Sequence, residues 1–82
     1  MQDEATYVGS IIQGIVSFPD EVRIDRTSDE RGILLTLTVA KQDMGKVIGR
    51  NGDNINAVRR IAKAFGAARK AAISIKINDY EN

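Results

Sequence analysis

The sequence contains no cysteine and no histidine, and its single proline is Pro19. Without cysteine the chain has neither a disulfide framework nor a thiolate metal site, which suits a reducing cytoplasm. Without histidine it lacks the commonest general base, the usual zinc ligand and any Ser-His-Asp triad. Serines are present, but none lies in a G-x-S-x-G pattern. We therefore expect a protein that is not an enzyme and that uses no cofactor or metal.

Long apolar runs are also missing. No run approaches the roughly 20 residues that a membrane-spanning helix needs, and the N-terminal stretch MQDEATYVGS lacks a basic segment followed by an apolar one. The 82 residues are 43% hydrophobic and 28% charged, as in a soluble globular protein with a modest core. We expect a single domain over residues 1–82 with its core at about 4–78, a cytoplasmic location, no signal peptide and no membrane contact.

The net charge of +1 hides an uneven distribution along the chain. Residues 1–40 carry three basic and seven acidic side chains, whereas residues 41–70 carry eight basic and two acidic ones. A basic block of this kind is typical of a nucleic-acid footprint, although on one helix it is often only a solvated face. Charge alone leaves both interpretations open.

The first half of the chain predicts one helix followed by a hairpin. An apolar i, i+3, i+4, i+7 stripe indicates an amphipathic helix from about Glu4 to Ser17, capped by Asp3. Alternating polarity then predicts a short strand over 22–26, a polar turn TSDERG, and a clear strand in ILLTLTVA over 33–40.

The second half predicts two helices and a last strand. Asp43 is expected to cap a short helix from about Met44 to Ile48, and a longer helix is expected over 53–65 with Gly66 as its C-cap. Alternating isoleucines predict a strand over 73–77, and the final DYEN is expected to fray. The fold class is therefore α+β in the order α-β-β-α-α-β. We expect a three-stranded mixed sheet with the three helices packed on one face, and the last two strands parallel.

Between the two later helices, the glycines of G-R-N-G at 49–52 break what would otherwise be one helix. One interpretation is a tight corner, because glycine tolerates positive φ and asparagine is the next most permissive residue. A corner does not explain the basic residue at the tip or the cations on the following helix.

The stretch VIGRNG at 47–52 resembles the Val/Ile-Ile-Gly-x-x-Gly signature of KH domains. A lone G-x-x-G is common by chance, but here GKVIG leads into it, DNINAVRRIAKAFGA follows it, and FPDEV comes after the first helix. The predicted element order matches the type II KH arrangement over essentially the whole chain. The sequence is most similar to the stand-alone bacterial RNA-binding proteins of the KhpA family. That resemblance implies a loop that clamps about four nucleotides of single-stranded nucleic acid.

The resemblance assigns roles to the loop and its neighbours. Gly49 and Gly52 would let phosphates approach the backbone, with the start of the next helix adding partial positive charge. Arg50 would pair with a phosphate, and Asn51 would add an amide contact. Lys46 would meet the same nucleic-acid backbone.

Each flanking apolar residue has two interpretations, as core or as the apolar floor of a base-binding groove. Core is favoured for Val47 and Ile48, whereas Ile55 lies so close to the loop that it is expected to serve both purposes and to contact RNA. Arg59 is expected to contact the nucleic-acid backbone, the alternative being a solvated helix surface. The chain has four aromatic residues and none adjoins the loop in sequence, which argues against recognition led by aromatic stacking.

Two functions from different classes remain open. The first is a sequence-tolerant binder of single-stranded RNA, with single-stranded DNA not distinguished. The second is chiefly a protein-interaction module with weak nucleic-acid binding, since one small KH domain gains from avidity. The resemblance further implies a homodimer, pairing with a larger KH-containing RNA-binding protein, and bacterial RNA regulation linked to cell length and cell-wall homeostasis.

Overall fold

The computed structural model describes residues 3–78, so the expected fraying of 79–82 lies outside the described residues. Its helices and strands follow the expected order: α1 (Glu4–Gln13), β1 (Arg23–Asp29), β2 (Gly32–Thr38), α2 (Met44–Ile48), α3 (Asp53–Ala68) and β3 (Ile73–Ile77). Short 3-10 turns at Pro19–Glu21, Lys41–Asp43 and Arg50–Gly52 connect them. The strands form one sheet in the order β1-β2-β3, with β1 antiparallel and β3 parallel to β2. The expected α+β class and mixed sheet are confirmed.

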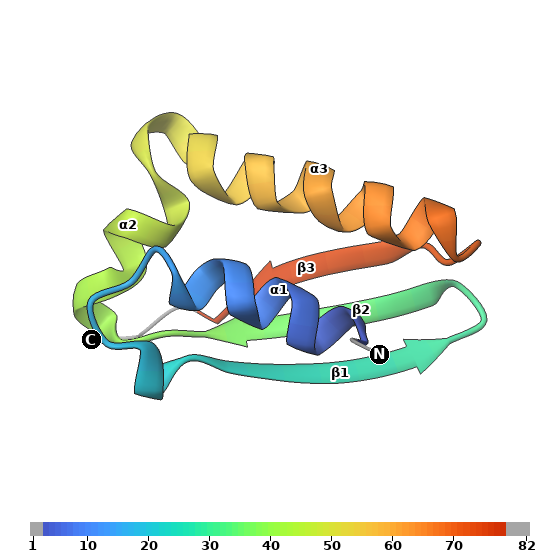
Figure 1. Ribbon diagram of the computed structural model, residues 1–82, viewed down its shortest axis with the longest axis horizontal. Coiled ribbons are helices and arrows are strands. Elements are labelled where there is room, and N and C mark those ends of the chain that lie inside the picture. Colours follow the sequence, from blue (N-terminus) through green and yellow to red (C-terminus); the bar gives the residue numbers. More distant parts are fainter. Residues whose placement is uncertain (1–2, 79–82) are drawn as a thin grey trace.

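The three helices lie on one side of the sheet (Figure 1). On that side Leu35 of β2 and Ile75 of β3 are buried, whereas Ser74 and Lys76 on the opposite face are exposed. The core joins the covered sheet face to the helices and consists of Val8, Ile12, Leu35, Leu37, Val39, Val47, Ile55, Val58, Ala62, Ile73 and Ile75. A strand with one covered face needs this alternation, so the period of two in the sequence predicted the covered face correctly.

Helix α1 begins as expected and ends early. The Asp3 carboxylate accepts a hydrogen bond from the Thr6 N–H at 2.8 Å, which lowers the pKa of Asp3. The helix ends at Gln13 rather than at Ser17, and the N–H of Gly14 donates to the carbonyls of Ser10 and Ile11. The expected extension to Ser17 is therefore wrong, because the chain after Gly14 turns away to contact α2.

The hairpin is longer than predicted. Strand β1 runs to Asp29 instead of ending near residue 26, and Thr27 and Ser28 pair with Leu34 and Ile33 of β2. The polarity of TSDERG predicts a turn over all six residues, but the turn is confined to Glu30 and Arg31. Residues 27–29 belong to β1, because an edge strand tolerates polar side chains and those of β1, apart from half-buried Ile24, are exposed.

Helix α3 passes through Gly66 and ends at Ala68, so the prediction of Gly66 as a C-cap is wrong. Gly66 is buried, and a Cβ added there would lie 2.4 Å from the Ala71 carbonyl oxygen. Its own carbonyl accepts the N–H groups of Arg69 and Ala71 at 2.9 and 2.8 Å. The glycine is therefore needed for the close return of the chain into β3, and the positive φ of 55° at Lys70 completes that turn.

Candidate nucleic-acid interface

The loop between α2 and α3 has the backbone conformation that its glycines permit. Gly49 has φ 75° and ψ 174°, a region essentially restricted to glycine, and Gly52 has φ 80° and ψ 13°. Asn51 between them has φ 58°, which asparagine tolerates better than most residues. A Cβ at Gly49 would lie 2.8 Å from the Asn54 nitrogen, whereas at Gly52 the nearest neighbouring atom is the Asn56 side-chain nitrogen at 3.5 Å. Gly52 is therefore half-buried backbone where an added Cβ would meet only one side-chain atom, at ordinary contact distance.

The tip of the loop presents polar groups to solvent. The side chains of Arg50 and Asn51 are both exposed. The N–H of Gly49 donates to the Gly45 carbonyl at 2.9 Å, and the N–H of Gly52 donates to the Gly49 carbonyl at 3.2 Å. Within residues 3–78, the N–H groups of Arg50 and Asn51 do not donate to another protein group. The loop thus combines a guanidinium, an amide and unengaged backbone donors, which are suited to binding phosphate oxygens.

A bridge across the corner involves Asn54, a residue that the sequence argument did not single out. Its side-chain nitrogen donates to the Lys46 carbonyl at 2.7 Å and so connects the start of α3 to the last turn of α2. The bond satisfies a carbonyl that a helix end leaves without an intrahelical partner. No spacing in the sequence could have indicated this contact, because it depends on the angle between the two helices.

Lys46 lies on α2, one turn before the loop, and is exposed. Its ammonium donates a hydrogen bond to the Ser17 hydroxyl, on the segment that follows α1. Asp43 directly precedes α2 as expected, but its side chain does not cap that helix. The carboxylate instead accepts hydrogen bonds from the N–H groups of Ser17 and Phe18, each at 3.0 Å. The predicted capping bond of Asp43 is therefore wrong, because the early end of α1 brings other donors to this carboxylate.

The apolar residues beside the loop belong mainly to the core. Val47 is fully buried and Ile48 packs, partly buried, against the core cluster. Ile55 is 4% exposed, which leaves little of its surface for contact with a base. The core interpretation is therefore the one that burial favours for all three.

Arg59 lies farther along α3, about 9 Å from Asp53 at the usual rise per residue. Its guanidinium donates to the Asn56 side-chain oxygen at 3.3 Å and to the Ile75 carbonyl of β3 at 3.2 Å. The structure thus places Arg59 between α3 and the edge of β3, and apart from the loop tip where Arg50 and Asn51 lie.

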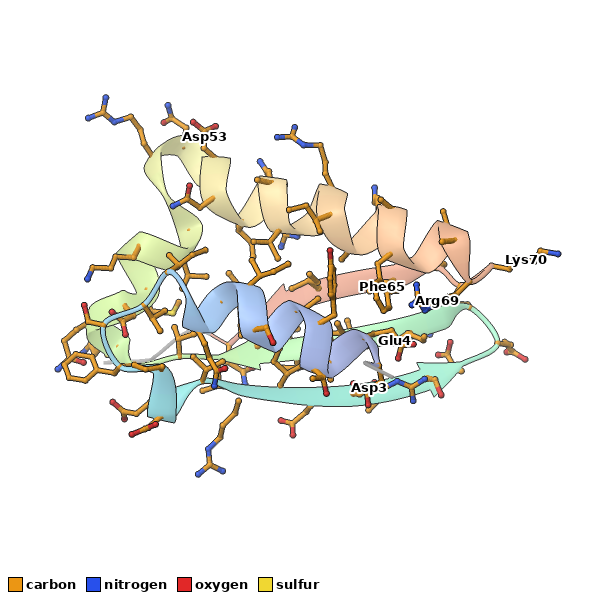
Figure 2. The ribbon with its side chains drawn as sticks, viewed as in Figure 1. Asp3, Glu4, Asp53, Phe65, Arg69 and Lys70 are labelled. Carbon is orange, nitrogen blue, oxygen red and sulfur yellow. The ribbon has the colours of Figure 1, made fainter. Side chains whose placement is uncertain are left out.

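The ion pairs Glu4–Arg26 at 2.7 Å and Asp29–Arg31 at 3.5 Å both lie in the acidic part of the chain. Arg50 and Lys46 form no ion pair with any described residue. The exposed carboxylate of Asp53 stands at the corner where α3 begins (Figure 2). The corner is therefore a site of unpaired positive charge with one acidic neighbour.

The aromatic rings lie elsewhere. Tyr7 and Phe65 stack with their centroids 4.5 Å apart, and the Arg69 guanidinium lies 3.7 Å from the Phe65 ring centroid. Phe65 and Arg69 belong to the end of α3 opposite Asp53 (Figure 2). Across the part of the chain that the structure describes, no cluster of acidic, histidine or cysteine side chains could hold a metal ion. No helix there has both the length and the apolar character needed to cross a bilayer.

The class of protein follows from the fold and this loop together. A three-stranded mixed sheet in the order α-β-β-α-α-β, with a G-x-x-G loop between α2 and α3, is the type II KH fold.

Comparison of the sequence with known proteins agrees with this assignment of the fold. The family model for the KhpA/KhpB KH domain matches residues 5–77. An RNA-binding protein KhpA from Clostridium acetobutylicum is 37% identical over 68 residues, which cover 83% of this chain and 91% of that protein. Proteins of the same name from Chlamydia pneumoniae (34% identical; 87% of this chain, 91% of that protein) and Mycobacterium leprae (39%; 72% and 74%) are also similar. The chain belongs to the KhpA/KhpB family of KH-domain proteins.

Proposed function

We propose that this protein binds single-stranded RNA, without catalysis, by laying the phosphate backbone against the Gly49–Gly52 loop. The observation that carries the proposal is the loop itself, where bare backbone at Gly52 adjoins the exposed Arg50 and Asn51. Relatives that share most of the chain are named RNA-binding proteins, which supports the same function here.

The geometry favours contacts to phosphate over contacts to bases. Backbone N–H groups and a guanidinium recognise phosphate oxygens regardless of sequence. The charged contacts in this proposal are few, with Arg50 and Lys46 at the loop and Arg59 beyond it. Binding is therefore expected to be modest in affinity and weakened by salt, with each phosphate contact on a single strand contributing a slope of about −0.7 in log K against log salt.

The double variant Arg50→Asp/Asn51→Asp tests this proposal. Both side chains are exposed, so the fold should be kept while the loop becomes repulsive to phosphate. The matched control is Arg60→Asp/Lys63→Asn, which makes the same net change in charge at exposed positions on α3. Fluorescence anisotropy with a short labelled RNA should show binding abolished in the loop variant and reduced less in the control. Unchanged affinity of a folded loop variant would refute the loop mechanism.

Self-association is a second function that one observation favours. Ile61 on α3 is a large apolar side chain that is 41% exposed, and a dimer would add avidity to a small RNA site. We propose a homodimer or pairing with a larger KH-containing RNA-binding protein. Light scattering at micromolar concentrations tests the homodimer, and an Ile61→Lys variant should be monomeric. A wild-type chain that stays strictly monomeric would contradict it.

The cellular setting proposed for this activity is bacterial RNA regulation in the cytoplasm, connected with cell length and cell-wall homeostasis. It follows from the family resemblance alone. Crosslinking in cells followed by sequencing of the attached RNA would test whether RNA is bound there and would identify the targets. Deletion of the gene should alter cell length if the wider role is correct.

A further inference from the structure

Asp43 is a buried carboxylate that joins two distant parts of the chain. Only 1% of the residue is exposed. One carboxylate oxygen accepts the N–H of Ser17 and the other accepts the N–H of Phe18, both at 3.0 Å. The segment after α1 is therefore fixed against the start of α2.

The chemistry of this contact requires a carboxylate. Each of the two neighbouring N–H groups bonds a separate acceptor atom, because aspartate offers one oxygen to each. Asparagine would offer one oxygen and one NH2 group, so one of the two N–H groups would face a donor. The two N–H donors thus explain why an aspartate occupies a buried position.

Fixing Ser17 has a consequence for the proposed RNA site. The Ser17 hydroxyl accepts a hydrogen bond from the Lys46 ammonium, and Lys46 lies one helical turn after Asp43. The Lys46 carbonyl also accepts a hydrogen bond from Asn54. Lys46 is therefore held through both its side chain and its backbone, although it is exposed.

We propose that Asp43 and Ser17 are positioning residues that hold the Lys46 ammonium ready for a phosphate; this inference rests on the proposed function. A free lysine side chain loses considerable rotamer freedom when it binds, and a side chain fixed during folding avoids that cost on binding. The ammonium has three donors, so one bond to Ser17 leaves two for phosphate oxygens.

A double-mutant cycle between Ser17 and Lys46 tests the proposal. Ser17→Ala removes only the hydroxyl, because Asp43 holds the backbone N–H of Ser17 rather than its side chain. With a labelled single-stranded RNA octamer, Ser17→Ala should weaken binding about threefold and Lys46→Ala about fivefold. The double variant should bind no more weakly than Lys46→Ala. Ser10→Ala is the matched control, because it removes an exposed hydroxyl that donates to the Thr6 carbonyl within α1, and its affinity should equal that of the wild type.

Asp43→Asn extends the cycle. It should lower the thermal midpoint and weaken RNA binding, and in the Lys46→Ala background it should cause no further loss of affinity. Wild-type affinity for Ser17→Ala or for Lys46→Ala would overturn the proposal, as would losses that multiply in the Ser17→Ala/Lys46→Ala variant. If the positioning role of Asp43 and Ser17 is refuted in this way, RNA binding by the loop is still supported as long as Arg50→Asp/Asn51→Asp abolishes binding. Wild-type affinity of that loop variant would instead refute the proposed function.

Discussion

Gly49→Ala and Gly52→Ala are expected to harm the protein in different ways, because the two glycines have different surroundings. An added Cβ at Gly49 would lie 2.8 Å from the backbone nitrogen of Asn54, while at Gly52 it would meet only the Asn56 side chain at 3.5 Å. Left-handed backbone costs an L residue about 1–2 kcal/mol, so Gly52→Ala should lower the free energy of unfolding by about 1 kcal/mol. Gly49→Ala should lower the free energy of unfolding by about 3 kcal/mol, since the cost of a clash with backbone adds to the cost of a conformation that only glycine adopts readily.

Urea unfolding followed by circular dichroism measures these differences, and Gly45→Ala provides the control. Gly45 lies inside α2 and an added Cβ there meets nothing within 4 Å, so this change should raise the free energy of unfolding by up to about 1 kcal/mol. In a domain of this size, about 1 kcal/mol corresponds to about 4–8 °C in the thermal midpoint.

Gly52→Ala is also expected to affect RNA binding while the protein stays folded. Its methyl group would stand on the surface where a phosphate approaches the backbone, so affinity should fall by about tenfold. Equal destabilisation by Gly49→Ala and Gly52→Ala would refute the packing argument. A folded Gly52→Ala variant with wild-type affinity would refute the role of the bare backbone.

Three further predictions concern other residues. Asp53→Asn should strengthen RNA binding about twofold, because it removes the acidic neighbour of the loop. Fluorescence anisotropy at several salt concentrations would measure the change in affinity, and weaker binding would contradict the electrostatic argument. Asn54→Ala should lower the free energy of unfolding by about 1 kcal/mol through loss of its bond to Lys46, as measured by urea unfolding. An unchanged free energy of unfolding would show that this bond does not stabilise the fold. Asp3→Ala should lower the thermal midpoint at neutral pH. The Thr6 N–H holds the pKa of Asp3 below its ordinary value, so the contribution of Asp3 is present above its unfolded-state pKa and is lost as pH falls through the folded-state pKa. The difference from wild type should shrink in acid, and a difference that grows would contradict this sign.

Local pattern was enough to predict the elements and the covered sheet face. The alternation of Ile73 and Ile75 with polar residues, and the G-x-x-G break, each correspond to an observed element. These features depend on residues close in sequence, where period and glycine content indicate the backbone directly.

The errors came from contacts that form only when the elements pack together. The end of α1 and the role of Asp43 depend on each other, because the Ser17 N–H donates a hydrogen bond to the Asp43 carboxylate, 26 residues later in the chain. The local pattern predicts a helix end at Gly66, but α3 continues through this residue, which lies close to the Ala71 carbonyl. The contacts of Asn54 and Arg59 also require the packed arrangement of α2, α3 and β3. Hydrophobic period and glycine content do not indicate any of these contacts.

The central claim is that RNA lies against the Gly49–Gly52 loop, and NMR mapping tests it most directly. A 15N-labelled sample would be titrated with a single-stranded RNA octamer at low salt. The largest shifts are expected at the amides of Arg50, Asn51 and Gly52, with smaller ones at Lys46. Shifts concentrated at the opposite end of α3 around Arg69, or no shifts in the loop at saturating RNA, would contradict the claim.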